Sequence, residues 1–142
     1  MNFNKDLCFG KTYEKKLLRY LPNVFQYSFT GEGLCKAYDL KVLTDKGVEV
    51  LYEVKADRHT ARTGNICIEF ACHGKDSGIS TTESHYWAIF VVQNGKEDDL
   101  YIVETDFICQ LIQDTKYHTI KMCGDYNRSR CYLFKEKLFE QY

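Results

Sequence analysis

The stretch AYDLKVLTDKGVEVLYEVKADR, residues 37–58, constrains the fold most, because its turn sets the register of two strands. Apolar and polar side chains alternate on both sides of the turn, which predicts strands at residues 37–44 and 48–56. The loop TDKGV has three residues that end in glycine, a pattern typical of a type I turn with Gly47 in the left-handed bulge position. The sequence therefore predicts an antiparallel hairpin.

The register of this hairpin places two acids opposite each other. With Gly47 as the bulge residue, Thr44 faces Val48, and the same pairing continued along the strands sets Asp39 against Glu53. Their Cβ atoms are then expected to lie roughly 5 Å apart. A two-residue loop would shift the register by one residue and put the two acids on opposite faces. The acidic pair therefore depends on the turn.

A lysine joins the acidic pair, because Lys55 follows Glu53 by two residues and shares its strand face. Two adjacent carboxylates repel each other and favour a cation between them. Oxygen ligands suit Mg²⁺ or Mn²⁺, which also accepts ligands from phosphate and activates water. Lys55 is then placed to orient that water, to help deprotonate it, or to stabilise charge on a phosphorane. Asp39, Glu53 and Lys55 are the candidate catalytic residues, with Asp39 and Glu53 as metal ligands; the alternative is a solvated sheet surface.

Two more acids are candidates for the same cluster. The predicted helix at residues 12–21 carries Glu14 on the side of its leucines, which is the side that faces inward. In the predicted strand at residues 65–72, the alternation leaves Glu69 on the polar face. Glu69 joins the cluster if this strand pairs beside residues 48–56. The alternatives are that Glu14 reaches solvent at the helix edge and that Glu69 is exposed.

The segment GKDSGISTTES, residues 74–84, is rich in hydroxyl groups. Ser80 and Glu83 have capping-box spacing, which predicts a helical turn near residues 81–85. The segment is either a capped turn or a place where hydroxyls and a helix N-terminus meet phosphate, with basic side chains gripping the backbone. The candidate nucleic-acid contacts are Arg58, Arg62, Lys75, Ser77, Thr81 and Thr82.

The remaining pattern predicts a single mixed α/β domain over residues 1–142. No repeat, linker or low-complexity segment divides the chain. A helix is expected at residues 106–114, capped by Thr105 or Asp106 and with an apolar inner face. Further strands are predicted at residues 24–30, 86–93, 100–104, 117–123 and 131–134, and a further helix at residues 135–141.

Charge and cysteine content narrow the class of protein. The net charge of −1 gives no global attraction to nucleic acid, so binding of a polyanion has to come from local patches. Seven cysteines at unpatterned spacing, without a signal peptide, favour free thiols in a reducing compartment such as cytoplasm or nucleus. Cys67, Cys72 and His73 are close in sequence, but Cys67 and Cys72 alternate onto opposite faces, which disfavours structural zinc. No apolar run approaches the roughly 20 residues of a membrane span, so a soluble protein is expected.

These residues resemble a known family. The pattern YDL…YEVK, preceded by a helix that bears an acid, resembles the PD-(D/E)XK nuclease superfamily, which has the restriction-endonuclease-like fold. The stretch GNICIEF…SGISTTESHYWAIF is similar to small phage- and virus-type members of that group. In element order the resemblance covers residues 12–135. Tyr38 stands where the first half-motif of the family has proline.

The resemblance implies a mixed central sheet flanked by helices, and Mg²⁺- or Mn²⁺-dependent hydrolysis of DNA that leaves a 5′-phosphate. By position it implies Asp39 and Glu53 as metal ligands, Lys55 as the catalytic lysine, and Glu14 and Glu69 as assisting acids. It also implies frequent homodimers and a viral or phage protein acting inside its host. The small size favours cleavage of branched DNA in recombination or repair over a restriction enzyme. The alternatives are a non-catalytic nucleic-acid-binding or assembly protein on the same fold, and an RNA endonuclease.

Overall fold

A computed structural model describes residues 12–30, 37–123 and 128–140, and it shows a mixed α/β fold with two sheets. The five-stranded sheet has the order β1 (Val24–Phe29), β2 (Leu40–Thr44), β3 (Glu49–Asp57), β6 (Tyr86–Val91) and β7 (Asp99–Glu104). The four-stranded sheet has the order β5 (Lys75–Asp76), β4 (Asn65–Cys72), β9 (Ser129–Lys135) and β8 (Thr119–Cys123). The helices are α2 (Thr60–Thr63), α3 (Thr105–Gln113), α4 (Lys137–Glu140), the 3₁₀ turns η1 (Leu18–Tyr20) and η2 (Gly78–Ser80), and a helical segment at residues 12–17. The predicted mixed α/β class is confirmed.

The five-stranded sheet combines antiparallel and parallel pairs. Strands β1, β2 and β3 form an antiparallel meander, β6 lies parallel beside β3, and β7 lies antiparallel to β6. The connection from β3 to β6 passes through α2, β4, β5 and η2, so β4 belongs to the second sheet, where it pairs with β5 and β9. The pairing of residues 65–72 beside β3, which was the condition for Glu69 to join the acidic cluster, is therefore not formed. The residues Trp87–Val91 of β6 are all buried, and a strand that is apolar on both faces takes the central position instead.

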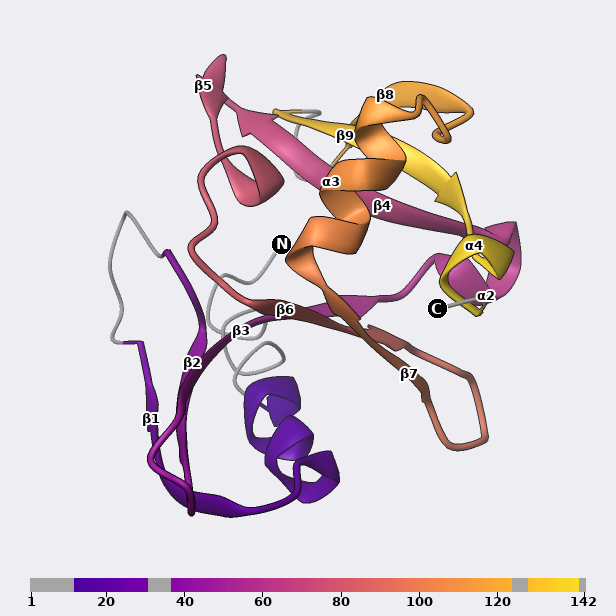
Figure 1. Cartoon of the computed structure of the whole chain (residues 1–142). Helices are drawn as coiled ribbons and strands as arrows, with labels where there is room; N and C mark the ends of the chain where they lie inside the picture. The colour runs from indigo at the N-terminus through magenta and orange to yellow at the C-terminus, as the bar shows by residue number, and fades with distance from the viewer. Residues whose placement is uncertain (1–11, 31–36, 124–127, 141–142) are drawn as a thin grey trace.

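Alternate residues of β6 contribute to two hydrophobic cores, one on each face of the five-stranded sheet. Figure 1 shows this sheet between the N-terminal helix on one side and α3 with the four-stranded sheet on the other. Ala88 and Phe90 pack with Tyr13 and Leu17 of that helix. The core on the other side comprises Ile66, Ile68, Trp87, Ile89, Val103, Ile108, Phe134 and Phe139. Because Glu53 pairs with Trp87 in register, its side chain belongs to the face that meets α3 and the four-stranded sheet.

The hairpin has the predicted turn and register. Gly47 has φ of 78°, and its N–H donates to the Thr44 carbonyl oxygen at 3.0 Å, which closes the turn. The Thr44 N–H donates to the Val48 carbonyl oxygen at 2.9 Å. Leu40 faces Tyr52 at the far end of the ladder. The prediction from the turn is therefore confirmed as far as Leu40, one residue from the acidic pair.

Helix α3 packs by its predicted apolar face. Ile108 is buried in the core, and Phe107, Leu111 and Ile112 pack against the same core. The predicted cap is wrong, because the N-cap residue is Glu104 without a side-chain cap. The hydroxyl of Thr105 donates instead to the Ser84 carbonyl oxygen at 2.6 Å, which ties the helix to the preceding loop. Residue 141 of the predicted last helix lies outside the described residues. None of the helices in the described ranges is long and apolar enough to cross a membrane.

The helical turn predicted near residues 81–85 forms earlier in the chain, as η2. Ser80 does not begin a helix: its hydroxyl donates to the Phe70 carbonyl oxygen at 2.9 Å. The physical reason is that the backbone of β4 supplies an acceptor to this loop. A tertiary contact therefore replaces the local capping box.

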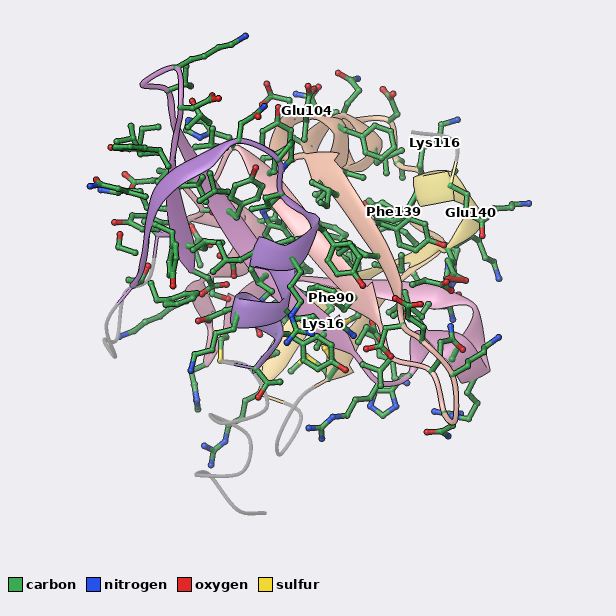
Figure 2. All side chains as sticks on the ribbon, turned by 90° about the horizontal axis from the view of Figure 1, so that it is seen from below. Lys16, Phe90, Glu104, Lys116, Phe139 and Glu140 are labelled. Carbon is green, nitrogen blue, oxygen red and sulfur yellow. A yellow bond between two sulfur atoms is a disulfide. The ribbon has the colours of Figure 1, made fainter. Side chains whose placement is uncertain are left out.

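A carboxylate fixes the N-terminal helix to the β6–β7 loop. Oδ2 of Asp98 accepts hydrogen bonds from the Tyr13 hydroxyl and from Nζ of Lys16, both at 2.9 Å, and Oδ1 accepts one from the Gln93 N–H at 3.0 Å. Figure 2 shows Lys16 beside Phe90, and its Nζ lies 5.4 Å from the centroid of that ring. Burial acts to raise the pKa of Asp98, but these three donors outweigh it and hold the pKa below its ordinary value.

We expect Asp98→Asn to lower the free energy of unfolding at pH 7 by about 1–3 kcal/mol, because it weakens a half-buried network of charge-assisted hydrogen bonds. A depressed carboxyl pKa stabilises the fold above the unfolded-state pKa of about 3.9, and this contribution is lost as the pH falls through the folded-state value. Urea unfolding from pH 7 to pH 3 measures the difference, which should shrink below about pH 4. Asp99→Asn, at an exposed neighbour, is the control. A difference that is constant with pH would contradict this assignment.

Candidate functional site

The two predicted acids are both buried carboxylates at the open end of the hairpin. Asp39 and Glu53 are each 9% exposed. Asp39 directly precedes β2, and its Oδ2 accepts a hydrogen bond from the Val54 N–H at 2.8 Å. Its own N–H donates to the Tyr52 carbonyl oxygen at 2.9 Å. The side chain of Asp39 is thus oriented by the backbone of β3, next to Glu53.

Lys55 contacts Glu53, as predicted from strand parity. Its Nζ lies 3.3 Å from Oε1 of Glu53 and 5.8 Å from the centroid of the Trp87 ring. Burial acts to lower the pKa of Lys55, but the charges of Glu53, Asp39 and Glu69 outweigh it and raise the pKa above its ordinary value. One ammonium group therefore lies among three carboxylates.

Glu69 reaches this group from the other sheet. Although β4 does not pair with β3, Glu69 and Lys55 line one pocket of 390 Å³. The hydroxyl of Ser77 donates to Oε2 of Glu69 at 3.0 Å. The backbone at Gly78 approaches Glu69 so closely that a Cβ atom there would come within 2.2 Å of the Glu69 carbonyl oxygen. The loop that follows β4 therefore positions Glu69, a role for Ser77 and Gly78 that their sequence did not indicate.

The role of Glu14 as a metal ligand stays a prediction. Its side chain is half-buried, on the helical segment at residues 12–17. That segment packs by Tyr13 and Leu17 against the face of the sheet opposite to the one that carries Glu53 and Lys55. Glu14 as a metal ligand would therefore have to act from the opposite side of the sheet or around its edge.

The candidate basic contacts separate into two groups. Arg58 and Arg62 line a pocket of 480 Å³ beside α2, and Arg58 also lines the pocket that contains Lys55. Lys75 lies in β5, and Figure 1 shows β5 and α2 at opposite ends of β4. A single patch that joins Arg58, Arg62 and Lys75 is therefore wrong, and the arginines are the ones beside the acidic site.

The hydroxyl-rich loop uses its side chains within the protein. The hydroxyl of Thr81 donates to the Gly78 carbonyl oxygen at 3.5 Å, and that of Thr82 to the Ala37 carbonyl oxygen at 3.4 Å. The short turn η2 has three residues and offers no helix N-terminus of the predicted kind. The loop braces β4 and the start of the hairpin; the helix expected after Ser80 does not form, and contact of these hydroxyls with phosphate stays a prediction.

Sequence reasoning missed a group of cysteines in the same pocket. Cys123 and Cys131 form a disulfide, so the expectation of free thiols throughout is wrong for this pair. Cys67 lies with its Sγ 3.4 Å from that of Cys123. Cys72, which strand alternation places on the opposite face from Cys67, lies beside Ser129, with its Sγ 3.7 Å from the hydroxyl oxygen. Cysteines on three strands meet here, and no local spacing signals that. Cys8 and Cys35 lie outside the described residues.

Cys67 is a poor candidate for a nucleophile. Burial first, and then the charges of Asp57 and Glu69, raise the pKa of Cys67 to about 11, although Lys55 and Lys121 act in the opposite direction. The thiol is therefore protonated at neutral pH, whereas nucleophilic cysteines need a lowered pKa.

The chemistry of the acidic site follows from its donors. Three carboxylates and one ammonium group leave an excess of negative charge in a partly enclosed place, which a divalent cation would offset. Oxygen donors of this kind fit a hard ion such as Mg²⁺ or Mn²⁺. Comparison of the chain with protein-family models, with curated proteins and with solved structures finds no match.

Proposed function

We propose that this protein is a DNA endonuclease that hydrolyses phosphodiester bonds with a divalent metal ion. The observation that carries the proposal is the pair of buried carboxylates, Asp39 and Glu53, at the end of a hairpin with a lysine ammonium beside them. Burying carboxylates is costly unless a cation or hydrogen-bond donors compensate them. Lys55 and Glu69 of this cluster line the 390 Å³ pocket, and a cluster of carboxylates beside a pocket is suited to binding phosphate through a metal ion.

In this proposal the residues have distinct roles. Asp39 offers Oδ1 to the metal while Val54 holds its Oδ2, and Glu53 offers the second carboxylate. When bound, Mg²⁺ would activate a water molecule and offset the negative charge of the phosphodiester. Lys55 orients the attacking water and stabilises negative charge on the phosphoryl oxygens. Glu69, held by Ser77, completes the acidic wall of the site.

The fold that we propose is restriction-endonuclease-like. It is supported by the element order of the described residues: a helix, then the antiparallel strands β1 to β3, then the parallel strand β6 beside β3. The helix at residues 12–17 and helix α3 lie on opposite faces of this sheet, which fits a central sheet flanked by helices (Figure 1).

The proposed substrate is DNA, with branched DNA of recombination or repair favoured. Arg58 lines both the pocket of the acidic site and the pocket beside α2, where Arg62 also lies. Two arginines at one end of the site are suited to binding the phosphate backbone of DNA. Such contacts do not depend on the base sequence. A homodimer would supply a second active site for the other strand of the DNA.

The test is to incubate the purified protein with branched and linear DNA and with RNA of the same sequence, with Mg²⁺, Mn²⁺ or EDTA. We expect cleavage of DNA with either metal, faster on branched DNA, and none with EDTA. Cleavage of RNA alone would instead support an RNA endonuclease. Metal-independent binding without cleavage of any substrate would contradict the proposal and support a non-catalytic binding or assembly protein on the same fold.

A further inference from the structure

Three sulfur atoms meet on the four-stranded sheet, at the wall of the 390 Å³ pocket. They belong to Cys67 in β4, Cys131 in β9 and Cys123 in β8, and all lie within 4.8 Å of one another. Strand β9 lies between the other two strands, and Cys131 pairs with Glu69 on one side and with Lys121 on the other. Cys67 and Cys123 are therefore its diagonal neighbours on the same face of the sheet.

A disulfide accounts for only two of these sulfurs. The Cα atoms of Cys123 and Cys131 are 6.7 Å apart, at the upper end of the range of about 4.4–6.8 Å that disulfides span. It leaves Cys67, whose Sγ is 3.4 Å from that of Cys123, without a role. Thiolates around one zinc ion, each about 2.3 Å from it in tetrahedral geometry, lie roughly 3.8 Å apart. Once the disulfide is reduced, one thiophilic ion can take all three sulfurs as ligands.

The charges around the cysteines also favour a cation. Two carboxylates, Asp57 and Glu69, act on Cys67 more strongly than the two ammonium groups of Lys55 and Lys121. Three thiolates added to this balance would leave an uncompensated charge in a half-buried place. A divalent ion offsets most of this negative charge. Without the ion, the protein avoids the charge only if the thiols stay protonated.

We propose that the reduced chain binds a thiophilic divalent ion, of the class of Zn²⁺, through Cys67, Cys123 and Cys131. A dithiol or phosphine reductant first gives two electrons and the medium two protons to the Cys123–Cys131 disulfide, and binding then releases one proton from each of the three thiols. All three cysteines line the 390 Å³ pocket, so the ion would be open to ligands from the pocket. This site is separate from Asp39 and Glu53 and does not depend on the proposed nuclease function.

Cobalt substitution tests the proposal. The full chain is reduced with a phosphine, freed of metal with a chelator, and titrated with Co²⁺ without oxygen. We expect one equivalent to produce thiolate-to-cobalt charge-transfer bands and the intense visible bands of tetrahedral cobalt, and Zn²⁺ to abolish both. Cys67→Ser should lower the affinity for Zn²⁺ by more than about 100-fold, because it removes a direct ligand. Cys72→Ser and Cys109→Ser are matched controls that should keep the spectrum.

A second measurement does not rely on variants. Zn²⁺ should protect Cys67, Cys123 and Cys131 of the reduced wild-type chain from alkylation, while exposed Cys109 reacts. Glu53→Gln should leave the cobalt spectrum unchanged, which separates this site from an oxygen-only site that gives no thiolate bands. Absence of charge-transfer bands in the reduced wild-type chain, or an unchanged affinity for Co²⁺ and Zn²⁺ in Cys67→Ser, would overturn the proposal.

Discussion

Replacing Glu53 with glutamine is expected to lower kcat/KM for metal-dependent DNA cleavage by at least about 1,000-fold, a loss of about 4 kcal/mol of transition-state stabilisation. The amide keeps the shape of the side chain but removes the negative charge that would hold the metal. It also removes the charge that contacts Nζ of Lys55 at 3.3 Å. Initial rates on branched DNA over a range of Mg²⁺ and Mn²⁺ concentrations measure the effect. A residual activity that rises with metal concentration would assign the loss to metal binding.

The companion variant is Lys55→Ala, for which we expect a loss of about 100- to 1,000-fold, the usual effect of removing a group that stabilises charge in the transition state. The hairpin offers a matched control in Lys41→Ala. Lys41 also lies near a glutamate, Glu49, at 3.9 Å, but Glu49 is exposed and close to the turn, whereas Glu53 is buried. Its rate should equal that of the wild type. If Glu53→Gln and Lys55→Ala cleave DNA as fast as Lys41→Ala with both metals, the acidic site is not catalytic.

The part of the site that the sequence predicted is the part that local chemistry determines. The position of Gly47 in TDKGV dictates a turn with one left-handed residue, and this turn dictates which residues face each other. From there, strand parity alone places Lys55 beside Glu53. The placement of Glu53 and Lys55 depends only on residues close in sequence, so a charged cluster could be predicted from them.

The parts that the sequence could not predict depend on pairing between distant strands. The alternation in residues 65–72 identified the polar face of Glu69 but not the partner of its strand, which is β9 and not β3. Because β6 is more apolar, it takes the place beside β3 and moves β4 to the second sheet. The cysteine group has the same origin, since Cys67 meets Cys131 only through that pairing. The alternation of apolar and polar residues indicates which side chains share a strand face. Which strands lie side by side depends instead on competition among all the strands for the central positions of the sheet.

Gly78→Ala is expected to lower the free energy of unfolding by about 2–5 kcal/mol, the largest effect on stability that we predict for a single methyl group. Two costs add. A residue with a Cβ atom at φ of 54° pays about 1–2 kcal/mol for the left-handed conformation. The new Cβ atom would also lie 2.2 Å from the carbonyl oxygen of Glu69, and relieving an overpacked contact typically costs about 1–3 kcal/mol. Urea unfolding at pH 7 measures the sum.

The chain provides a control that separates these two costs. Gly74 has φ of 74°, and a methyl group added there would meet nothing within 4 Å, so Gly74→Ala pays the conformational cost alone, about 1–2 kcal/mol. The excess loss in Gly78→Ala then measures the contact with Glu69. Because that contact positions a wall of the acidic site, Gly78→Ala should also slow DNA cleavage under conditions where it remains folded, whereas Gly74→Ala should not. Equal loss of stability in the two variants would mean that the η2 loop yields without moving β4, and that Glu69 is held by the Ser77 hydroxyl alone.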